Sequence, residues 1–251
     1  MRQELYQGVV YYRRVHFTPY PMIAHIVTID MTAPGIRFLV TPGQPDQELP
    51  LEARTTSAFA RASGVQIAIN GDGFTPWHAN DIFDYYPHSG DRVKPNGYAM
   101  SEGVEYGEGP EPTLYIAQNN AASFDGGIGP YNAISGSWMV VVNGEPVAGL
   151  DNTSPAPRTA VGLNSAGTKM VLFVADGRQP FYSQGATLYE MAELMAHYGA
   201  DNAMLLDGGG SSTLVIQNEL GLVRVMNSPI QSGIPGRERP VGNHLGVFAQ
   251  K

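Results

Sequence analysis

The chain has no cysteine, few charged residues and no long hydrophobic run. Without cysteine there can be no disulfide, no thiolate metal site and no cysteine nucleophile. A membrane-spanning helix needs roughly 18 consecutive apolar residues, and no stretch comes near that length, so no transmembrane segment is predicted. The pattern G-x-x-x-x-G-K is also missing, which excludes a P-loop nucleotide site.

Charge is scarce and mostly negative. Only 15% of the 251 residues are charged, and 23 acidic residues outnumber 15 basic ones, giving a net charge of −8. Such a field repels nucleic acids and anionic membranes, so neither is expected as a partner. An anionic substrate would have to be held by local arginines or by backbone amides.

The composition is that of a folded, β-rich protein. Hydrophobic residues make up 43% of the chain, which excludes an extended disordered protein. Its 30 glycines and 19 prolines predict many turns and few helices. We predict an α+β fold with a β-rich mixed sheet and a few helices. The proline-rich stretch at 154–157 is too short for a linker, so residues 1–251 are expected to form a single domain.

The first residues, MRQELYQGVVYYRR, lack the apolar run of a signal peptide. Two expectations follow for the compartment. The protein is cytoplasmic, or it is extracytoplasmic or secreted if Met1 follows a removed leader.

The stretch from 170 to 215 is the most informative part of the chain. Apolar runs predict buried strands over 170–175 and 203–206, on either side of a helix with apolar residues at three- and four-residue steps between Leu188 and Tyr198. Thr187 and Glu190 have the spacing of a capping box, and Gly199 can end the helix. Glu190 therefore has two interpretations, a helix cap and a catalytic acid.

A polar turn follows each of these two strands. The first turn is Asp176-Gly177-Arg178, and the second begins Asp207-Gly208-Gly209 and ends Ser211-Ser212. Consecutive glycines let a ligand approach the backbone amides, which form an anion-binding nest when they converge. The alternative is a tight turn that needs glycine only for its backbone angles. Acids and hydroxyls at strand ends favour a functional site.

Polar residues at other strand ends are further candidates. Asn70 follows a predicted strand over 65–69 and either starts a hairpin turn or faces a substrate hydroxyl. Arg158 enters a buried strand, where it acts either as an anion clamp or in an internal salt bridge with a turn aspartate. Arg239, Asn243 and His244 lie in a polar connection and can line the same site.

Residues 75–111 show no clear periodicity, which predicts a long irregular loop. Its aromatic residues, which include Trp77 and Phe83, either pack on one another or stack on a sugar ring. His16 and His25 are interpreted as core or strand-surface residues. The remaining predicted elements are strands over 8–12, 22–30, 35–40, 114–118, 137–142, 222–226 and 245–249, and a helix over 55–63.

Five segments of the chain resemble the phosphodiester glycosidase family. They are IAINGDGF, PRTAVGLN, FVADGRQPFYSQGATLYEMAELM, MLLDGGGSSTLV and RPVGNHLGVF, which together cover most of residues 65–249. The resemblance implies hydrolysis of a sugar 1-phosphodiester, with a phosphodiester-bearing small molecule or glycan as substrate. It also implies a site formed by Asn70, Arg158, Thr159, Asp176, Arg178, Ser183, Glu190, Asp207, Gly208, Gly209, Ser211 and Ser212.

The chemistry of such a substrate assigns roles to these residues. Arginine forks suit the phosphate leaving group, and the amides of Gly208 and Gly209 can add donors. Asp207 and Asp176 are predicted to serve the anomeric centre, with Glu190 in reserve. The sequence leaves metal dependence open, because Asp176, Asp207 and Asn70 offer the oxygen donors that calcium or magnesium prefers, but without EF-hand spacing.

Two other classes of function are compatible with parts of the sequence. A non-catalytic carbohydrate- or phosphate-binding module would use the same arginines and aromatic residues. A serine hydrolase would pair Ser211 or Ser212 with His244 and Asp176. Thr213 stands where the pattern G-x-S-x-G requires its last glycine, which disfavours the serine hydrolase.

Overall fold

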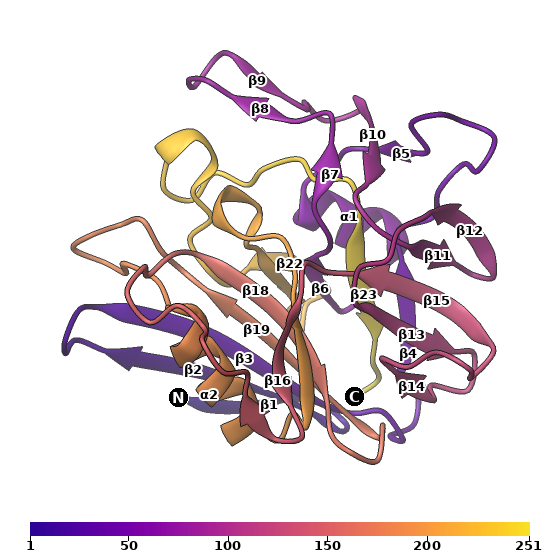
Figure 1. Ribbon diagram of the computed structural model, residues 1–251, viewed down its shortest axis with the longest axis horizontal. Helices are drawn as coiled ribbons and strands as arrows, with labels where there is room; N and C mark the ends of the chain where they lie inside the picture. The colour runs from indigo at the N-terminus through magenta and orange to yellow at the C-terminus, as the bar shows by residue number, and fades with distance from the viewer.

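The computed structural model describes residues 1–251, and most of its regular structure is β-sheet (Figure 1). The largest sheet contains eight strands, in the spatial order β1 (Arg2–Tyr6), β2 (Val9–His16), β3 (Met22–Asp30), β19 (Lys169–Ala175), β18 (Arg158–Leu163), β20 (Asn202–Leu205), β16 (Met139–Val142) and β17 (Glu145–Pro146). A five-stranded sheet follows the order β22 (Val223–Val225), β21 (Leu214–Gln217), β6 (Ile67–Asn70), β23 (His244–Phe248) and β4 (Arg37–Val40).

Three smaller sheets complete the strand inventory. One has five strands, β12 (Val104–Gly107), β11 (Ala99–Ser101), β15 (Pro130–Ser135), β13 (Thr113–Ala117) and β14 (Ala122–Ser123). Another has three, β5 (Leu51–Glu52), β10 (Arg92–Pro95) and β7 (Phe74–Thr75). The last is the hairpin of β8 (His78–Ala79) and β9 (Tyr85–Tyr86). The prediction of an irregular loop over 75–111 was therefore wrong, because strands of two to four residues are too short to show alternation.

All named strand pairs are antiparallel, so the expectation of a mixed sheet was also wrong. Strands β19 and β20, which precede and follow α2, run in the same direction, but β18 lies between them and pairs antiparallel with both. With two α-helices, the fold is β-rich as predicted but closer to all-β than to α+β.

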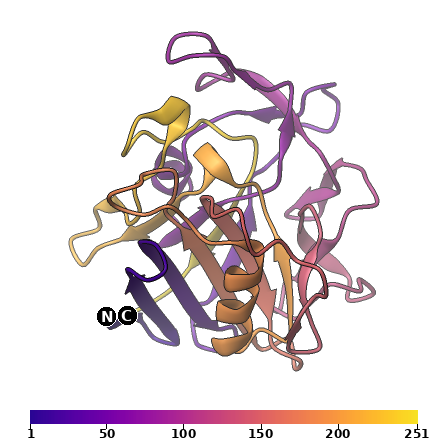
Figure 2. The ribbon, with the colours of Figure 1, turned by 60° about the vertical axis from the view of Figure 1, so that its left-hand side comes forward.

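The eight-stranded sheet and the sheet containing β6 enclose the main hydrophobic core. Val27 and Leu172 contribute from the first sheet, and Ile69 and Val247 from the second. Helix α2 (Leu188–His197) packs on the outer face of the large sheet, as Figure 2 shows, and α1 (Thr56–Ser63) packs on the outer face of the other. The result is a helix–sheet–sheet–helix arrangement.

Both helices begin and end where the sequence predicts. Thr55 caps α1 by accepting a hydrogen bond from the Ala58 amide, and Gly64 ends it with φ of 70°. Thr187 and Glu190 form the expected capping box on α2, and Gly199 follows that helix with φ of 100°. Neither helix is long and apolar enough to cross a membrane.

Candidate active site

The candidate site lies at one end of three neighbouring interior strands of the large sheet, where β19 and β20 end and β18 begins. Arg158 pairs with Ala175 and Ala160 pairs with Leu205, so the turns after β19 and β20 leave the sheet at the same edge. Two short helical turns, η1 (Gly209–Ser211) and η2 (Gln231–Gly233), pack against each other beside these strand ends (Figure 1). The fold therefore brings the Asp176 and Asp207 turns into one region.

Asp207 is the acid at the centre of this region. Its side chain is partly buried, and one carboxylate oxygen accepts a hydrogen bond from the Gly208 amide at 2.9 Å. Burial raises the pKa of Asp207, while the Ser211 hydroxyl and the charges of Arg239 and Arg178 act in the opposite direction. A carboxyl group is thus held beside two guanidinium groups in a site of restricted solvation.

The two arginines near Asp207 differ in how they are held. Arg239 donates to the Gln231 side chain at 2.6 Å and to the Ser211 hydroxyl at 3.3 Å, and its guanidinium lies over the ring of Trp77. Arg178 is exposed, and its side chain has no hydrogen bond or ion pair within the protein. One arginine is rigidly positioned, and the other is available to a ligand.

The glycine triplet makes room for these arginines. A Cβ on Gly210 would lie 2.6 Å from a guanidinium nitrogen of Arg239, and one on Gly209 would lie 3.1 Å from a nitrogen of Arg178. The predicted amide nest is not formed, because the Gly208 amide donates to Asp207 and the Gly209 amide donates to the Pro157 carbonyl at 3.0 Å. Glycine is needed here for close side-chain approach rather than for amides that bind an anion.

Arg158 is held by backbone carbonyls and not by a salt bridge with a turn aspartate. Its guanidinium donates to the carbonyls of Ala186 at 3.3 Å and Ser154 at 3.1 Å. Burial and the positive charge of Arg178 lower the pKa of Arg158, while Asp151 raises it. Arg158 therefore adds positive charge near Arg178, and no salt bridge joins it to Asp176 or Asp207.

Asn70 joins the two sheets beneath the site and is fully buried. Its side-chain oxygen accepts from the Thr159 hydroxyl at 2.8 Å and from the Thr213 amide at 3.1 Å, and its nitrogen donates to the Asp207 carbonyl at 2.7 Å. The predicted contacts of Asn70 and Thr159 with substrate are not available in this structure, because these bonds use both groups. They position the Asp207 turn instead.

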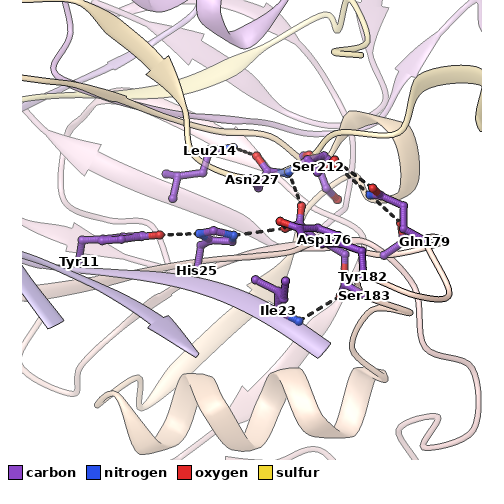
Figure 3. A network of polar contacts seen from close by, with 12 residues as sticks. Tyr11, Ile23, His25, Asp176, Gln179, Tyr182, Ser183, Ser212, Leu214 and Asn227 are labelled. Atoms are coloured by element: carbon purple, nitrogen blue, oxygen red, sulfur yellow. Dashed lines mark hydrogen bonds and ion pairs between the residues drawn. The ribbon is translucent and has the colours of Figure 1, made fainter. Parts of the chain in front are cut away.

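Asp176 is itself buried and belongs to a different network, drawn in Figure 3, which reaches the surface at Tyr182. Its carboxylate contacts His25 at 3.3 Å, accepts from the Tyr182 hydroxyl at 3.2 Å and also accepts from the Ser228 amide. The other ring nitrogen of His25 lies 2.7 Å from the Tyr11 hydroxyl. Asp176 and Asp207 share no hydrogen-bond partner, so the two acids are held by separate sets of contacts.

Ser183 is a structural member of the same turn. Its hydroxyl donates to the Asp176 carbonyl at 2.7 Å and accepts from the Ile23 amide at 3.0 Å. The side chain is fully buried and both bonds lie within the protein, so the contact of Ser183 with substrate stays a prediction and its observed role is to hold the turn.

Glu190 is a helix cap rather than a catalytic acid. Its carboxylate accepts from the Thr187 amide at 2.8 Å, and the Glu190 amide donates to the Thr187 hydroxyl at 3.1 Å. Tyr20 donates a further hydrogen bond to the carboxylate. Of the two interpretations drawn from the sequence, the structure supports the cap.

Glu190→Ala is expected to destabilise the fold by about 1 kcal/mol, as other losses of a cap do, and to leave kcat unchanged. Denaturant unfolding measures the first effect, and steady-state hydrolysis measures the second. Thr187→Ala is the matched control, since it removes the other half of the capping box. A large loss of kcat in Glu190→Ala alone would restore a catalytic role.

The serine hydrolase alternative lacks a Ser–His–Asp triad, because its three members do not contact one another. His244 is buried against Phe59, contacts the Thr41 hydroxyl at 2.9 Å, and has a pKa lowered to about 3 by burial. It has no contact with Ser211 or Ser212, and Asp176 is paired with His25 instead. The ring of His244 stacks on Phe59 of α1, so its contact with substrate stays a prediction. Ser212 is buried with an unpartnered hydroxyl.

No metal centre is formed by the proposed oxygen donors. No group of three or more His, Asp or Glu side chains is placed to hold an ion. The Asn70 oxygen is committed to Thr159 and Thr213, and Asp176 lies in its own network. The three donors therefore do not converge, and no step of the chemistry is assigned to a cation.

Several contacts of the site were not predicted from the sequence. Gln231 and Trp77 hold Arg239, and His25 contacts Asp176 across 151 positions of sequence. Asp72 is buried nearby and accepts from the Ser135 hydroxyl at 2.8 Å, and the charge of Asp207 adds to the burial that raises its pKa. Trp77 carried a signal as an aromatic residue in a polar segment, and Asp72 carried one as an acid in the turn after a predicted strand, whereas Gln231 carried none.

The family profile described as phosphodiester glycosidase matches residues 63–248, a range that contains every predicted site residue. The chain belongs to the phosphodiester glycosidase family. Within it, the chain is 27% identical over 203 residues to the human N-acetylglucosamine-1-phosphodiester alpha-N-acetylglucosaminidase, an alignment covering 72% of this chain and 38% of the human protein. It is also 44% identical over 63 residues to an SPbeta prophage-derived uncharacterized protein of Bacillus subtilis, covering 25% of this chain and 10% of that protein.

A solved structure has the same fold. It is the catalytic domain of zebrafish N-acetylglucosamine-1-phosphodiester alpha-N-acetylglucosaminidase, described as auto-inhibited by its pro-peptide. The match has a TM-score of 0.67 at 20% identity and covers 100% of this chain and 88% of that one. This phosphodiester glycosidase thus spans less than two fifths of the length of the human relative but nearly all of the zebrafish catalytic domain.

Proposed function

We propose that this phosphodiester glycosidase hydrolyses the glycosidic bond of a sugar 1-phosphodiester, with N-acetylglucosamine as the first sugar to test because the human relative's name specifies it. The observation that carries the proposal is the exposed, unpartnered Arg178, whose guanidinium extends from the turn after β19 to Gly209, beside Asp207 and Arg239. In a chain of net charge −8, this local pair of guanidinium groups favours an anionic ligand. We further propose that residues 1–251 form one domain, since residues from Val9 to Ala249 share one core.

Arg178 and Arg239 are assigned to the phosphate. A guanidinium fork matches two phosphate oxygens, and the leaving phosphate gains charge as the bond to the sugar breaks. Positive charge placed there in advance stabilises the transition state more than the ground state. Arg158, which donates from Nε and Nη2 to carbonyls, is assigned to contribute positive charge beside Arg178.

Asp207 is assigned to the anomeric centre. Its carboxylate is next to the proposed phosphate site. One of its oxygens accepts a hydrogen bond from the Gly208 amide, and the Ser211 hydroxyl lies nearby. An ionised carboxylate there can stabilise positive charge on the sugar or accept a proton from the attacking water. Asp176, whose oxygens are bonded to Tyr182 and Ser228, is assigned to hold the turn that carries Arg178.

In the proposed reaction water adds to the anomeric carbon, the C1–O bond breaks, and the products are the free sugar and a phosphate monoester. The test uses the methyl phosphodiester of N-acetylglucosamine in water enriched in oxygen-18. We expect free N-acetylglucosamine labelled at C1, and unlabelled methyl phosphate. Label in the phosphate would mean P–O cleavage, and binding without hydrolysis would identify a non-catalytic binding module.

A further inference from the structure

Trp77 connects the proposed phosphate site to solvent. The guanidinium carbon of Arg239 lies 5.1 Å from the centre of the Trp77 ring, within the range of a cation–π contact. The Trp77 side chain is nevertheless 50% exposed. A large aromatic surface at the edge of a polar site is therefore left open beside the arginine that is assigned to phosphate.

A second arginine of the same loop holds the hairpin that follows Trp77. Arg237 donates to the Ile82 carbonyl at 3.3 Å and to the Tyr85 hydroxyl at 3.0 Å, and its guanidinium lies over the Tyr85 ring. These contacts tie the hairpin β8–β9 to the segment that carries Arg239. The hairpin that follows Trp77 is thus fixed to the segment that carries Arg239, the residue whose guanidinium lies over the Trp77 ring.

Asp207, Arg239 and Trp77 follow one another from the interior of the site to the surface. Asp207 and Arg239 interact electrostatically, and Arg239 in turn contacts Trp77. A phosphodiester has two arms, and the arm whose C1 reacts must lie at Asp207. The second arm, which leaves with the phosphate, then extends from Arg239 toward the exposed indole.

The surroundings of Trp77 indicate the kind of group that fits. Asp81 and Asp84 are exposed on the same hairpin, and Arg237 is bonded to its Tyr85, so charges of both signs are present and neither sign of charge on the leaving arm is favoured. A neutral ring with a face of C–H groups needs no charged partner to stack on the indole. We propose that Trp77 is a specificity-determining residue that binds a neutral, ring-shaped aglycone beyond the phosphate; this rests on the proposed function.

Binding of the leaving group tests the proposal without requiring turnover. The probes are methyl phosphate and cyclohexylmethyl phosphate, which carry the same charge and differ by the ring, titrated calorimetrically into the full chain. We expect the ring compound to bind about tenfold more tightly, the effect of one good aromatic contact. Trp77→Ala also removes a contact of Arg239, so it is expected to weaken both probes but the ring compound more, which removes the preference. Trp77→Phe keeps a ring beside Arg239 and should keep part of the preference.

Phe83→Ala is the control, because Phe83 is an 84% exposed ring on the same hairpin, and it should change neither affinity. Equal weakening of both probes by Trp77→Ala would mean that Trp77 only supports Arg239, and would overturn the proposal. So would a native protein that binds both probes equally or binds neither. Ring-dependent binding without any hydrolysis of the matching diesters would retain the role of Trp77 and refute the proposed enzymatic function alone.

Discussion

Asp207→Asn is expected to lower kcat by about 10²–10⁴-fold, the usual range for losing a positioned catalytic carboxyl group. Asparagine has nearly the same shape but cannot carry the negative charge that the anomeric centre requires. Hydrolysis of the methyl phosphodiester of N-acetylglucosamine measures the loss, and circular dichroism checks that the fold is intact. Normal turnover by this variant would remove Asp207 from the catalytic machinery.

The same substitution is expected to raise Tm at neutral pH. Burial raises the pKa of Asp207 above its ordinary value of 3.8, so folding disfavours the ionised form. The stability that this group contributes is present below the unfolded pKa and is lost as the pH rises through the folded pKa. The gain from Asp207→Asn should therefore appear at pH 7 and disappear in acid below pH 3.8.

Asp176→Asn is the matched control, since the same chemical change is made at a fully buried carboxyl group bonded to Tyr182 and Ser228. It should lower Tm at neutral pH, because an amide presents one oxygen where the native network uses two. A rise in Tm in both variants would show that the two acids have equivalent environments, in conflict with their contacts.

Arg178→Gln is expected to lower kcat/KM for the phosphodiester by about 10²–10³-fold, in line with the loss of one preorganised group that stabilises developing charge. Tm should not change, because the native side chain has no partner within the protein. The backbone at Arg178 has φ of 57°, a conformation that glutamine tolerates no worse than arginine. The effect therefore reports on the ligand.

Arg178→Lys and a second substrate serve as controls. Lysine keeps the charge but not the fork, so its activity should fall between those of the native protein and Arg178→Gln. A nitrophenyl glycoside of the same sugar has no phosphate, and any hydrolysis of it should be insensitive to either substitution. Equal losses on both substrates would assign Arg178 to the sugar or to the fold.

The elements predicted most accurately from the sequence are those specified by residues close together in the chain. Helix α2 was recognisable from its apolar spacing, and its cap from Thr187 and Glu190, because capping involves residues three apart. Strands β3 and β19 were visible as buried apolar runs. The turns after β19 and β20 were correctly placed at one edge of the sheet, because the helical crossover makes these two strands run in the same direction.

Contacts between distant segments could not be read from the sequence. Strand β15 was missed, although it lies at the centre of its sheet between β11 and β13. The partners of Asn70 at Thr159 and of Asp176 at His25 are 89 and 151 positions away. Their residue types indicated polar chemistry, but only the packing of the two sheets decides whether a side chain faces a ligand or another strand.

The bonds of Asn70 make the site depend on the alignment of the two sheets. A slip of one sheet past the other would break the contacts with Thr159 and with the Asp207 carbonyl together, although most apolar side chains could still find new neighbours. The reactive turn would then lose its geometry while much of the secondary structure persists. On heating, loss of activity should accordingly precede the loss of the far-ultraviolet circular dichroism signal, because the hydrogen bonds of Asn70 break before the strands unfold.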